Sequence, residues 1–427
     1  MPTAFKTYSY RPLTGPLDVR SLPQNMVPGA FRWKQNFAVT QQGNLCRMPG
    51  WKRLFSERTA NNFDLHDQLL PIQLYYDNNN PVSAGADANT AYPPGALCSG
   101  DVLFRYGVRE PITLLFESTS PAGNRRLFAG TQSRLYQLNE SDGNWLLITD
   151  GMGHDNTRFK AAQLGDTIIF TNGYDAPFAH VLDQAPQGCA IRRISAIEDL
   201  TTLDITAAGI VIAYNGLMLL MDVTQEGTRY TSRSRWSDMN NPVSWVSSND
   251  SLANFQDLDY GEKILAAKEL GGYLMIYTNR SIWRAQVQGG TSNVFGFQRV
   301  YAEKKNQDKC LCYPNSLVST GSSHYYMGRD GIYEFNQYLP EPDLIDWLDT
   351  ASGILYDNLD ENCCEWPVAE YHPAEKEVWF SAPQLGDSCL PSRTLVASVK
   401  HSTSTYVDHG FSAFTNFRSD NQQDLRT

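Results

Sequence analysis

Cysteine is the residue type in this chain best able to hold a transition metal, but the spacing of the cysteines builds no metal site. Cys310 and Cys312 are separated by one residue, and Cys363 and Cys364 are adjacent. Two cysteines that bind one Zn²⁺ ion through their thiolates are usually separated by about two to four intervening residues. A histidine such as His324 could complete a site only through a tertiary contact. We therefore expect no metal, and cysteines that are mostly reduced thiols in strands or loops.

Nucleophilic catalysis has no support in the sequence either. The chain lacks a Gly-x-Ser-x-Gly elbow, a phosphate-binding P-loop and a Gly-x-Gly-x-x-Gly dinucleotide fingerprint. Its seven histidines are scattered, and only His401 and His409 are close to each other in sequence. A Ser-His-Asp triad can be assembled from distant positions, but nothing here nominates one. We expect a protein that is not an enzyme and that carries no cofactor.

Two groups of carboxylates could support other chemistry. Residues 140–145 read ESDGNW and faintly resemble the Asp-box of sialidases, Ser-x-Asp-x-Gly-x-Thr-Trp, which leaves glycoside hydrolysis as an alternative. The intervening positions are missing, so Asp142-Gly143 is better explained as a hairpin turn with Trp145 opening the next strand. The second group is explained by solvated carboxylates, with bound Ca²⁺ a distant second. Its members are Asp346, Asp349, Asp357, Asp360 and Glu361.

Basic residues gather in one stretch together with aromatic residues. Arg229, Arg233 and Arg235 surround Tyr230 and Trp236 in the sequence TRYTSRSRW. Side chains alternate along a strand, so Arg233 and Arg235 are expected on one face. Acidic residues flank the stretch, and this favours pairing between repeated units or subunits over nucleic-acid binding. We take the three arginines as candidates for an interaction site.

The elements that would position these residues are short strands separated by turns. Six segments share one order: an apolar strand, a turn, and a strand with aromatic residues or arginine. They begin near residues 126, 166, 216, 272, 324 and 376, a repeat of about 40–56 residues. Four-stranded propeller blades have about this length. We predict an all-β fold, a β-propeller-like array of antiparallel blades, over an unrelated pair of sandwiches; six markers do not prove six blades.

Local turn and helix signals refine this prediction. Asn172-Gly173 and Asp330-Gly331 mark hairpin turns within two of the six segments. Helical periodicity is weak everywhere except at residues 344–355, where the apolar spacing predicts one short helix.

Composition divides the chain into four parts. Residues 1–60 form an extended N-terminal arm that contributes strands to the propeller, and residues 61–110 form a loop-rich insertion. Within that insertion, residues 77–95 are low in apolar side chains and cannot bury a core. The propeller core covers residues 111–415, and residues 416–427 form an exposed tail.

Length and charge exclude several classes of protein. The chain has 427 residues, and its 46 Asp and Glu outweigh its 35 Lys and Arg to give a net charge of −11. Binding nucleic acid through its phosphates requires clustered positive charge, so this acidic chain is a poor candidate for it. The longest apolar stretch, residues 209–221, is interrupted by Tyr214, Asn215 and Gly216, and a membrane helix needs about 20 apolar residues. Residues 1–10 lack the pattern of a secretory signal, so folding in a cytoplasm is expected.

Three sequence segments, at the start, in the middle and near the end of the chain, carry short motifs that are informative when taken together. The arm GPLDVRSLPQNMVPGAFRWKQNFAVTQQGNLCRMPGWKRL contains Gly-x-Leu-x-Arg-x-Pro-Gly at residues 43–50. The middle of the chain, KILAAKELGGYLMIYTNRSIWRAQVQGG followed by FGFQRV, is a strand pair ending in Ser-Ile-Trp-Arg and then a strand with phenylalanine. The later MGRDGIYEFN carries Asp-Gly-Ile-Tyr at residues 330–333. In order and spacing, these phrases resemble tail proteins of short-tailed bacteriophages across about residues 10–400.

The resemblance implies the tail nozzle or tail tubular family, also described as packaged-DNA stabilisation proteins. Its members are β-propellers that assemble, typically as hexamers, below the portal and adaptor. The expected partners are therefore a portal-adaptor protein, tail fibre or spike proteins, and needle or plug proteins. Genomic DNA would pass through the channel without specific binding, and the chain would not insert into a membrane. The expected location is the tail of the virion, after folding in the host cytoplasm.

This chain also departs from the family. Some members carry inserted domains that are absent here, and no fibre-binding or adaptor-binding residue can be matched. Six copies at −11 carry about −66 charges, and acidic walls would repel moving DNA. The alternative is a propeller surface protein that binds or hydrolyses carbohydrate. Tryptophans could stack on its sugars, although tryptophan in blades more often lies in the core; they are Trp236, Trp245, Trp283 and Trp379.

Overall fold

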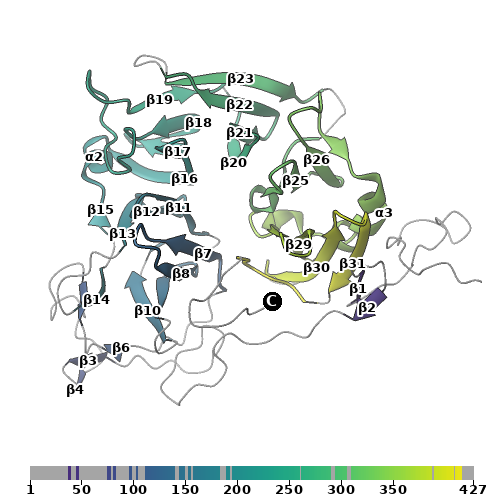
Figure 1. Ribbon diagram of the computed structural model, residues 1–427, viewed down its shortest axis with the longest axis horizontal. Helices are drawn as coiled ribbons and strands as arrows, with labels where there is room; N and C mark the ends of the chain where they lie inside the picture. Colours follow the sequence, from purple (N-terminus) through teal and green to yellow (C-terminus); the bar gives the residue numbers. More distant parts are fainter. Residues whose placement is uncertain are drawn as a thin grey trace, which may run out of the picture. The chain divides into compact units, whose positions relative to one another are not determined.

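The computed structural model describes residues 111–415 with short gaps, together with the backbone of six short strands closer to the N-terminus. The gaps are residues 140–143, 150–151, 155–156, 183–188, 193–194, 260, 290–293, 305–308, 387–388 and 408. The described chain is almost entirely strands and turns (Figure 1).

Six four-stranded antiparallel sheets follow one another along the chain. The first holds β7 (Leu114–Thr119), β8 (Arg125–Gly130), β9 (Leu135–Asn139) and β10 (Asn144–Thr149). The second holds β11 (Lys160–Leu164), β12 (Thr167–Thr171), β13 (Phe178–Val181) and β15 (Ser195–Ala196). The third holds β16 (Ile205–Tyr214), β17 (Leu217–Gln225), β18 (Thr228–Trp236) and β19 (Asn254–Asp257).

The remaining three sheets repeat the same meander. The fourth holds β20 (Ile264–Leu270), β21 (Tyr273–Thr278), β22 (Ser281–Val287) and β23 (Phe295–Ala302). The fifth holds β24 (Val318–Ser319), β25 (His324–Met327), β26 (Ile332–Phe335) and β27 (Asp343–Leu344). The sixth holds β28 (Val368–His372), β29 (Glu377–Pro383), β30 (Pro391–Ser398) and β31 (Thr403–Val407).

These sheets are the blades of a six-bladed β-propeller, which confirms the predicted fold class. Each of the six sequence segments proves to be the second and third strands of one blade, for example β8–β9 in the first blade and β29–β30 in the sixth. The blade count, which the sequence left open, is therefore six. The period was visible because the second and third strands of each blade are joined by a turn and lie close together in the sequence.

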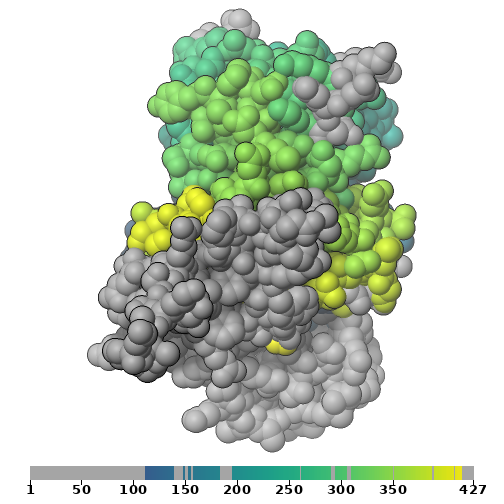
Figure 2. All heavy atoms as spheres, turned by 90° about the vertical axis from the view of Figure 1, so that its right-hand side faces the viewer, coloured from purple at the N-terminus to yellow at the C-terminus, as the bar shows by residue number. Residues whose placement is uncertain are grey.

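The chain divides into two compact units. One comprises residues 1–50 and 303–411 and contains the fifth and sixth blades; the other comprises residues 51–302 and 412–427 and contains the first four. Figure 2 shows the molecule from the side on which β31 is labelled in Figure 1, and its yellow-green and yellow atoms belong to the C-terminal blades.

Apolar clusters fill the spaces between successive blades of each unit. Phe128 and Phe170 pack between the first and second blades, and their ring centroids are 5.7 Å apart. Trp236 and Phe295 pack between the third and fourth blades, at 4.9 Å. Burying one such side chain contributes about 1.5–3 kcal/mol. The faces of the blades, more than their hydrogen-bonded edges, hold neighbouring blades together.

Turn residues follow the predicted pattern. Asn215 and Gly216 join β16 to β17 with positive φ angles of 47° and 77°, the combination that a two-residue hairpin turn requires. These residues are the interruption that argued against a membrane helix. The chain also reverses after Asn172, whose Oδ1 accepts hydrogen bonds from the backbone nitrogens of Tyr174 and Asp175 at 3.0 Å and 2.8 Å.

Helical structure is scarce, as expected. The predicted helix is α3 (Asp346–Tyr356), and Leu348 and Leu355 on it are buried against the fifth and sixth blades. Leu344 lies in β27 instead, so the helix begins two residues later than the prediction. The other helical segments within the described residues are α2 (Glu198–Thr202), η2 (Pro314–Ser316) and η3 (Glu361–Cys363).

Short strands precede the first blade. In the predicted arm, β1 (Phe37–Val39) and β2 (Leu45–Arg47) form a hairpin, and β1 lies beside β31. In the predicted insertion, β3 (Tyr75–Asp77) pairs with β4 (Asn80–Val82) and β6 (Val102–Leu103), and β5 (Ala96–Cys98) pairs with β14 (Cys189–Arg192). The rest of both segments, and the tail at 416–427, lies outside the described residues.

One pair of cysteines differs from the expectation of reduced thiols. Cys363 and Cys389 form a disulfide, with their Cα atoms 5.2 Å apart. Cys310, Cys312 and Cys364 carry thiols, as expected. The pair could not be recognised in the sequence because tertiary structure joins two cysteines that are 26 positions apart.

Candidate interaction site

The three arginine candidates lie on β18, the third strand of the third blade, between β17 and β19. Arg233 and Arg235 share one face of the strand, as predicted, because both donate to Oε1 of Gln225, at 3.1 Å and 3.3 Å. Both guanidinium groups also lie over the ring of Phe255, at 4.3 Å and 5.4 Å from its centroid. We call Arg229, Arg233 and Arg235 with these contacts the arginine cluster.

Arg229 is paired with a buried carboxylate. It donates from Nε and Nη2 to the two oxygens of Asp222, at 2.8 Å and 2.6 Å. The Asp222 side chain is 4% exposed, whereas that of Arg229 is 49% exposed. A charged group in the middle of the apolar strand β17 is thus neutralised by a two-point contact, the strongest geometry for such a pair.

The backbone makes room for this carboxylate. Asp222 has a φ of 56° and stands where the β17–β18 register shifts, a bulge between Met221 and Val223. Gly209 lies opposite on β16, and a Cβ atom there would come within 2.8 Å of Asp222 Oδ2. The bulge therefore requires glycine at position 209.

Arg233 is paired with Asp257 of β19. Its Nε and Nη2 donate to the two carboxylate oxygens at 2.7 Å and 2.9 Å, and its guanidinium lies 3.6 Å from the centroid of the Tyr230 ring. The hydrogen bond to Asp257 raises the pKa of Arg233, because it stabilises the charged form.

Arg235 is buried without a carboxylate. Only 2% of it is exposed, and besides Gln225 it contacts the carbonyl oxygen of Trp245, at 3.5 Å from Nη2. Its Nε has no hydrogen-bond partner among the described residues. Burial, and then repulsion from Arg233, lower the pKa of Arg235 to about 10. This guanidinium is the least satisfied charge of the arginine cluster.

The pairing differs from the sequence interpretation in one respect. Asp222 and Asp257 belong to the same blade as the arginines, so Arg229 and Arg233 pair within a blade and not between blades. The sequence pointed to acidic neighbours but could not show that strands β17 and β19 supply them. Arg229, whose side chain is half-exposed, is the member of the cluster that is most open to solvent. An intermolecular role for it stays a prediction.

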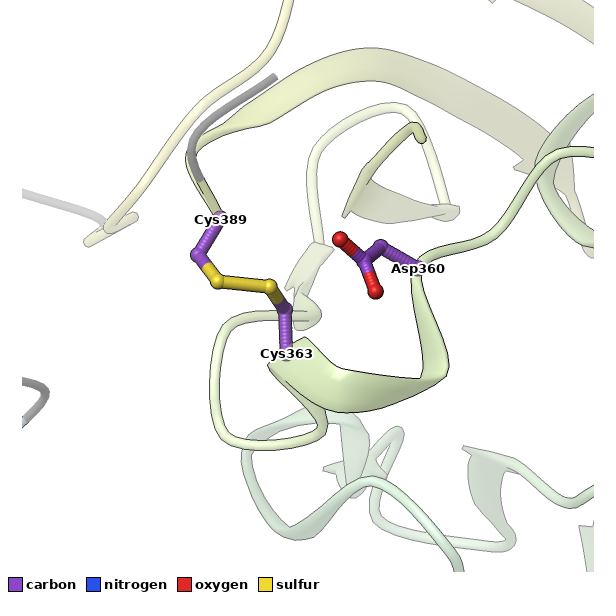
Figure 3. A group of neighbouring side chains, drawn as sticks. All are labelled: Asp360, Cys363 and Cys389. Atoms are coloured by element: carbon purple, nitrogen blue, oxygen red, sulfur yellow. A yellow bond between two sulfur atoms is a disulfide. The ribbon is translucent and has the colours of Figure 1, made fainter. Parts of the chain in front are cut away.

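The carboxylates at the end of the fifth blade do not gather around one point. Asp346 and Asp349 lie in the first turn of α3, and Asp360 caps η3. Within the described chain, the one group of three potential metal ligands is Asp360 with Cys363 and Cys389, and the two sulfurs are bonded to each other (Figure 3). The arrangement gives no support to a Ca²⁺ site made of the acidic cluster.

Two of the four tryptophans proposed for sugar stacking lie in the core. Trp236 and Trp245 are 3% and 0% exposed. Trp283 is half-buried and donates from Nε1 to Ser281 Oγ at 2.7 Å, and Trp379 donates to Glu377 at 3.1 Å. Trp145 is the second residue of β10, one position after the predicted strand start, while residues 140–143 of the Asp-box resemblance lie outside the described residues.

Sequence reasoning missed a buried polar network in the fourth blade. Glu262 is 8% exposed, and its Oε2 accepts hydrogen bonds from Thr278 at 2.9 Å and Ser281 at 2.5 Å. Arg299 lies 4.0 Å from the other oxygen. These hydrogen bonds tie the Glu262 carboxylate to the turn between β21 and β22. No local pattern signals this network, because Glu262 lies 16 residues or more from its partners.

No family model matches the sequence, and no curated protein matches it. In addition, no helix within the described part of the chain has the length and apolar character to cross a membrane.

Solved structures with a similar fold were found. One is PorZ, described as an essential bacterial surface component of the type-IX secretion system of Porphyromonas gingivalis, with 10% identity and a TM-score of 0.42. The similarity covers 74% of this chain and 34% of PorZ, so the chain spans about a third of that protein's length. Another is the β-propeller domain of Cps50 (Swd1) from Myceliophteria thermophila, with 13% identity, a TM-score of 0.44, and coverage of 70% and 88%. A third is the WD40 domain of Neurospora crassa Pan2, with 10% identity, a TM-score of 0.38, and coverage of 70% and 80%.

The class of this protein therefore follows from its own sheets: it is a six-bladed β-propeller protein. Likenesses this remote assign no partner or activity.

Proposed function

We propose that this chain is a structural protein of a virion, the nozzle of a short bacteriophage tail. In this role, copies of the chain form a ring, typically a hexamer, below the portal-adaptor complex. The ring makes the exit channel for DNA and helps to retain the packaged genome.

The observation that carries the proposal is an ordered set of three phrases placed on the strands of a propeller. Leu45 and Arg47 of the arm motif fall on β2. The Ser-Ile-Trp-Arg phrase begins β22, and Phe295 and Phe297 of the next phrase lie on β23. Asp-Gly-Ile-Tyr forms the turn into β26. A propeller is the fold that the family resemblance implies.

The residues of these sequence segments hold turns and blade edges in shape. The Tyr333 hydroxyl donates to Asp330 Oδ1 at 2.7 Å and so closes the Asp-Gly turn. Gly331 is also constrained, because a Cβ atom there would lie 2.5 Å from Leu344 Cδ1. Such residues fix turns and blade edges, which suits a structural protein.

The charge of the chain agrees with a conduit for DNA. Six copies at −11 each would carry about −66 charges. The most basic stretch of the sequence, the arginine cluster, has two of its three charges paired with carboxylates. Basic side chains that are already paired offer little attraction to phosphates.

The proposal is tested by the assembly state of the purified protein and by the protein content of particles. A hexamer has a mass of about 288 kDa, six times 48.0 kDa. Native mass spectrometry and negative-stain electron microscopy of the protein mixed with its portal-adaptor complex should show six copies in a ring. A chain that stays monomeric in this mixture and is absent from purified virions would overturn the proposal.

A further inference from the structure

A small group of potential ligands lies where η3 meets the loop between β29 and β30. One carboxylate oxygen of Asp360 and the sulfurs of Cys363 and Cys389 all lie within 4.8 Å of one another (Figure 3). Cys363 is buried, at 2% exposure. The two cysteines are joined in a disulfide, which is the oxidised form of the pair.

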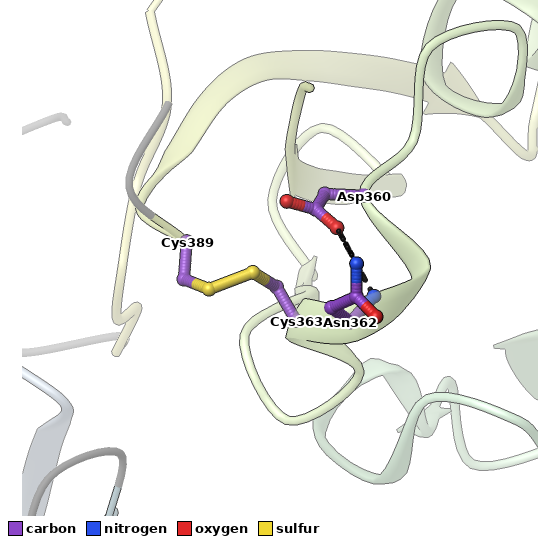
Figure 4. The surroundings of a disulfide bond; sticks show 4 residues. All are labelled: Asp360, Asn362, Cys363 and Cys389. Atoms are coloured by element: carbon purple, nitrogen blue, oxygen red, sulfur yellow. Dashed lines mark hydrogen bonds between the residues drawn. A yellow bond between two sulfur atoms is a disulfide. The ribbon is translucent and has the colours of Figure 1, made fainter. Parts of the chain in front are cut away.

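The Asp360 carboxylate is held in a fixed orientation. Its Oδ1 accepts hydrogen bonds from the backbone nitrogen and from Nδ2 of Asn362, both at 3.1 Å (Figure 4). Its Oδ2 has no hydrogen-bond partner among the described residues and lies on the side of the disulfide in Figure 4. Hydrogen bonds to one oxygen of a carboxylate are a common means of orienting the other toward a metal.

Backbone contacts hold the two segments together independently of the sulfur–sulfur bond. The backbone nitrogen of Leu385 donates to the carbonyl oxygen of Asn358 at 2.8 Å. Leu359 and Gln384 form an isolated β-bridge. Because these contacts flank the cysteines, reduction of the disulfide should leave the two thiols close to each other.

From this geometry we propose that the reduced protein binds one Zn²⁺ ion through Cys363, Cys389 and Asp360. Two thiolates and a carboxylate are ligands that Zn²⁺ accepts, and a water molecule would take the fourth position. In a tetrahedral site with zinc–sulfur bonds of about 2.3 Å, the sulfurs stand about 3.8 Å apart. That separation fits the present Cα–Cα distance of 5.2 Å and the 4.8 Å spread of the ligand atoms.

The two forms exclude each other. A dithiol or phosphine reductant supplies two electrons, and with two protons the disulfide becomes two thiols while the reductant is oxidised to a disulfide or a phosphine oxide. Zn²⁺ then displaces both thiol protons and accepts a lone pair from each sulfur and from Asp360. Oxidation of the pair removes two of the three protein ligands. The two segments are thus linked by a bound metal ion in the reduced protein and by the disulfide in the oxidised protein. This inference does not depend on the proposed virion function.

The experiment uses Co²⁺ as a spectroscopic probe of the full chain. The protein is reduced with a phosphine, which is removed by gel filtration without oxygen, and is then titrated with Co²⁺ and afterwards with Zn²⁺. We expect thiolate-to-cobalt charge-transfer absorption that saturates at one equivalent and is lost when Zn²⁺ is added. The oxidised protein should show none of this absorption. Reduced wild-type protein that binds no stoichiometric Co²⁺ would overturn the proposal.

Three variants separate this site from the other thiols. Cys363→Ser should abolish the absorption, and Asp360→Asn, which keeps both cysteines, should weaken binding at least about tenfold. Cys364→Ser is the matched control and should leave the titration unchanged. Circular dichroism verifies that each variant is folded. The proposal fails if Cys364→Ser removes the absorption, or if Asp360→Asn binds as tightly as the wild type.

Discussion

At the scale of single residues, the arginine cluster shows how charged side chains are accommodated within a blade. Asp222 and Arg229 form a two-point pair, and Asp257 does the same for Arg233. Arg235 has no carboxylate partner among the described residues. The pairs of Arg229 and Arg233 should stabilise the blade, whereas the buried charge of Arg235 should not. Unfolding of suitable variants measures this difference.

Replacement of Asp222 tests the first contact. Asp222→Ala removes the pair and places alanine at a φ of 56°, so we expect a loss of about 2–3 kcal/mol in the free energy of unfolding. Asp222→Asn is the control, because asparagine tolerates positive φ and keeps the shape; it should lose about 1 kcal/mol. Urea unfolding provides the comparison, and equal losses in the two variants would contradict the assignment.

Replacement of Arg235 tests the unpaired charge. Arg235→Met removes a buried cation that burial and Arg233 both disfavour, so the free energy of unfolding should stay within about 1 kcal/mol of the wild type or increase. The matched variant Arg233→Met leaves Asp257 without its partner and should lose about 1–2 kcal/mol. Thermal and urea denaturation compare the two. A larger loss for Arg235→Met than for Arg233→Met would show that Arg235 is a stabilising group.

At the scale of elements, the bulge in β17 depends on the strand beside it. Gly209→Ala would bring a Cβ atom within 2.8 Å of Asp222 Oδ2, so we expect a loss of about 2 kcal/mol from overpacking. In the background Asp222→Gly, which removes that carboxylate and accepts positive φ, the same change should cost less than about 0.5 kcal/mol. A double-mutant cycle by urea unfolding measures this coupling. Additive effects would mean that the two positions do not constrain each other.

Much of the element pattern was predictable because it is local. The six hairpin segments, the Asn215-Gly216 interruption and the helix near residue 348 are all written in adjacent residues. The partners of the arginine cluster were not, because Asp257 lies 24 positions from Arg233. The disulfide between Cys363 and Cys389 was missed for the same reason. Asp222 was among the acidic residues that flank the arginine stretch, but the run LMLLMDV does not reveal that it stands at a bulge in β17.

At the scale of the whole molecule, buried tyrosines in the fourth blade, in and just before the fifth blade, and in α3 predict sensitivity to alkaline pH. Burial raises the pKa of Tyr277, Tyr313, Tyr325 and Tyr356, because the phenolate is disfavoured away from water. Their stabilisation is complete below the unfolded pKa of about 10 and is lost as pH rises above it, since the unfolded chain then releases protons that the folded chain keeps.

The free energy of unfolding should therefore fall above about pH 10, by roughly 1.4 kcal/mol per tyrosine and pH unit. Arg235 acts in the opposite sense, because its lowered pKa of about 10 means that the folded chain loses a proton first. One such group only partly offsets four tyrosines. Urea unfolding at about pH 8, 10 and 11 measures the slope, and a constant or rising stability would contradict the burial of these phenols as ionisable groups.

The proposed place of this propeller is the end of a short phage tail, and electron cryomicroscopy of phage particles made in cells that express this chain tests that position most directly. We expect a ring of six propellers at the end of the short tail, below the portal and adaptor, with density into which the six blades of this chain fit. Tail density built from a different fold, with this chain absent from the particle, would contradict it.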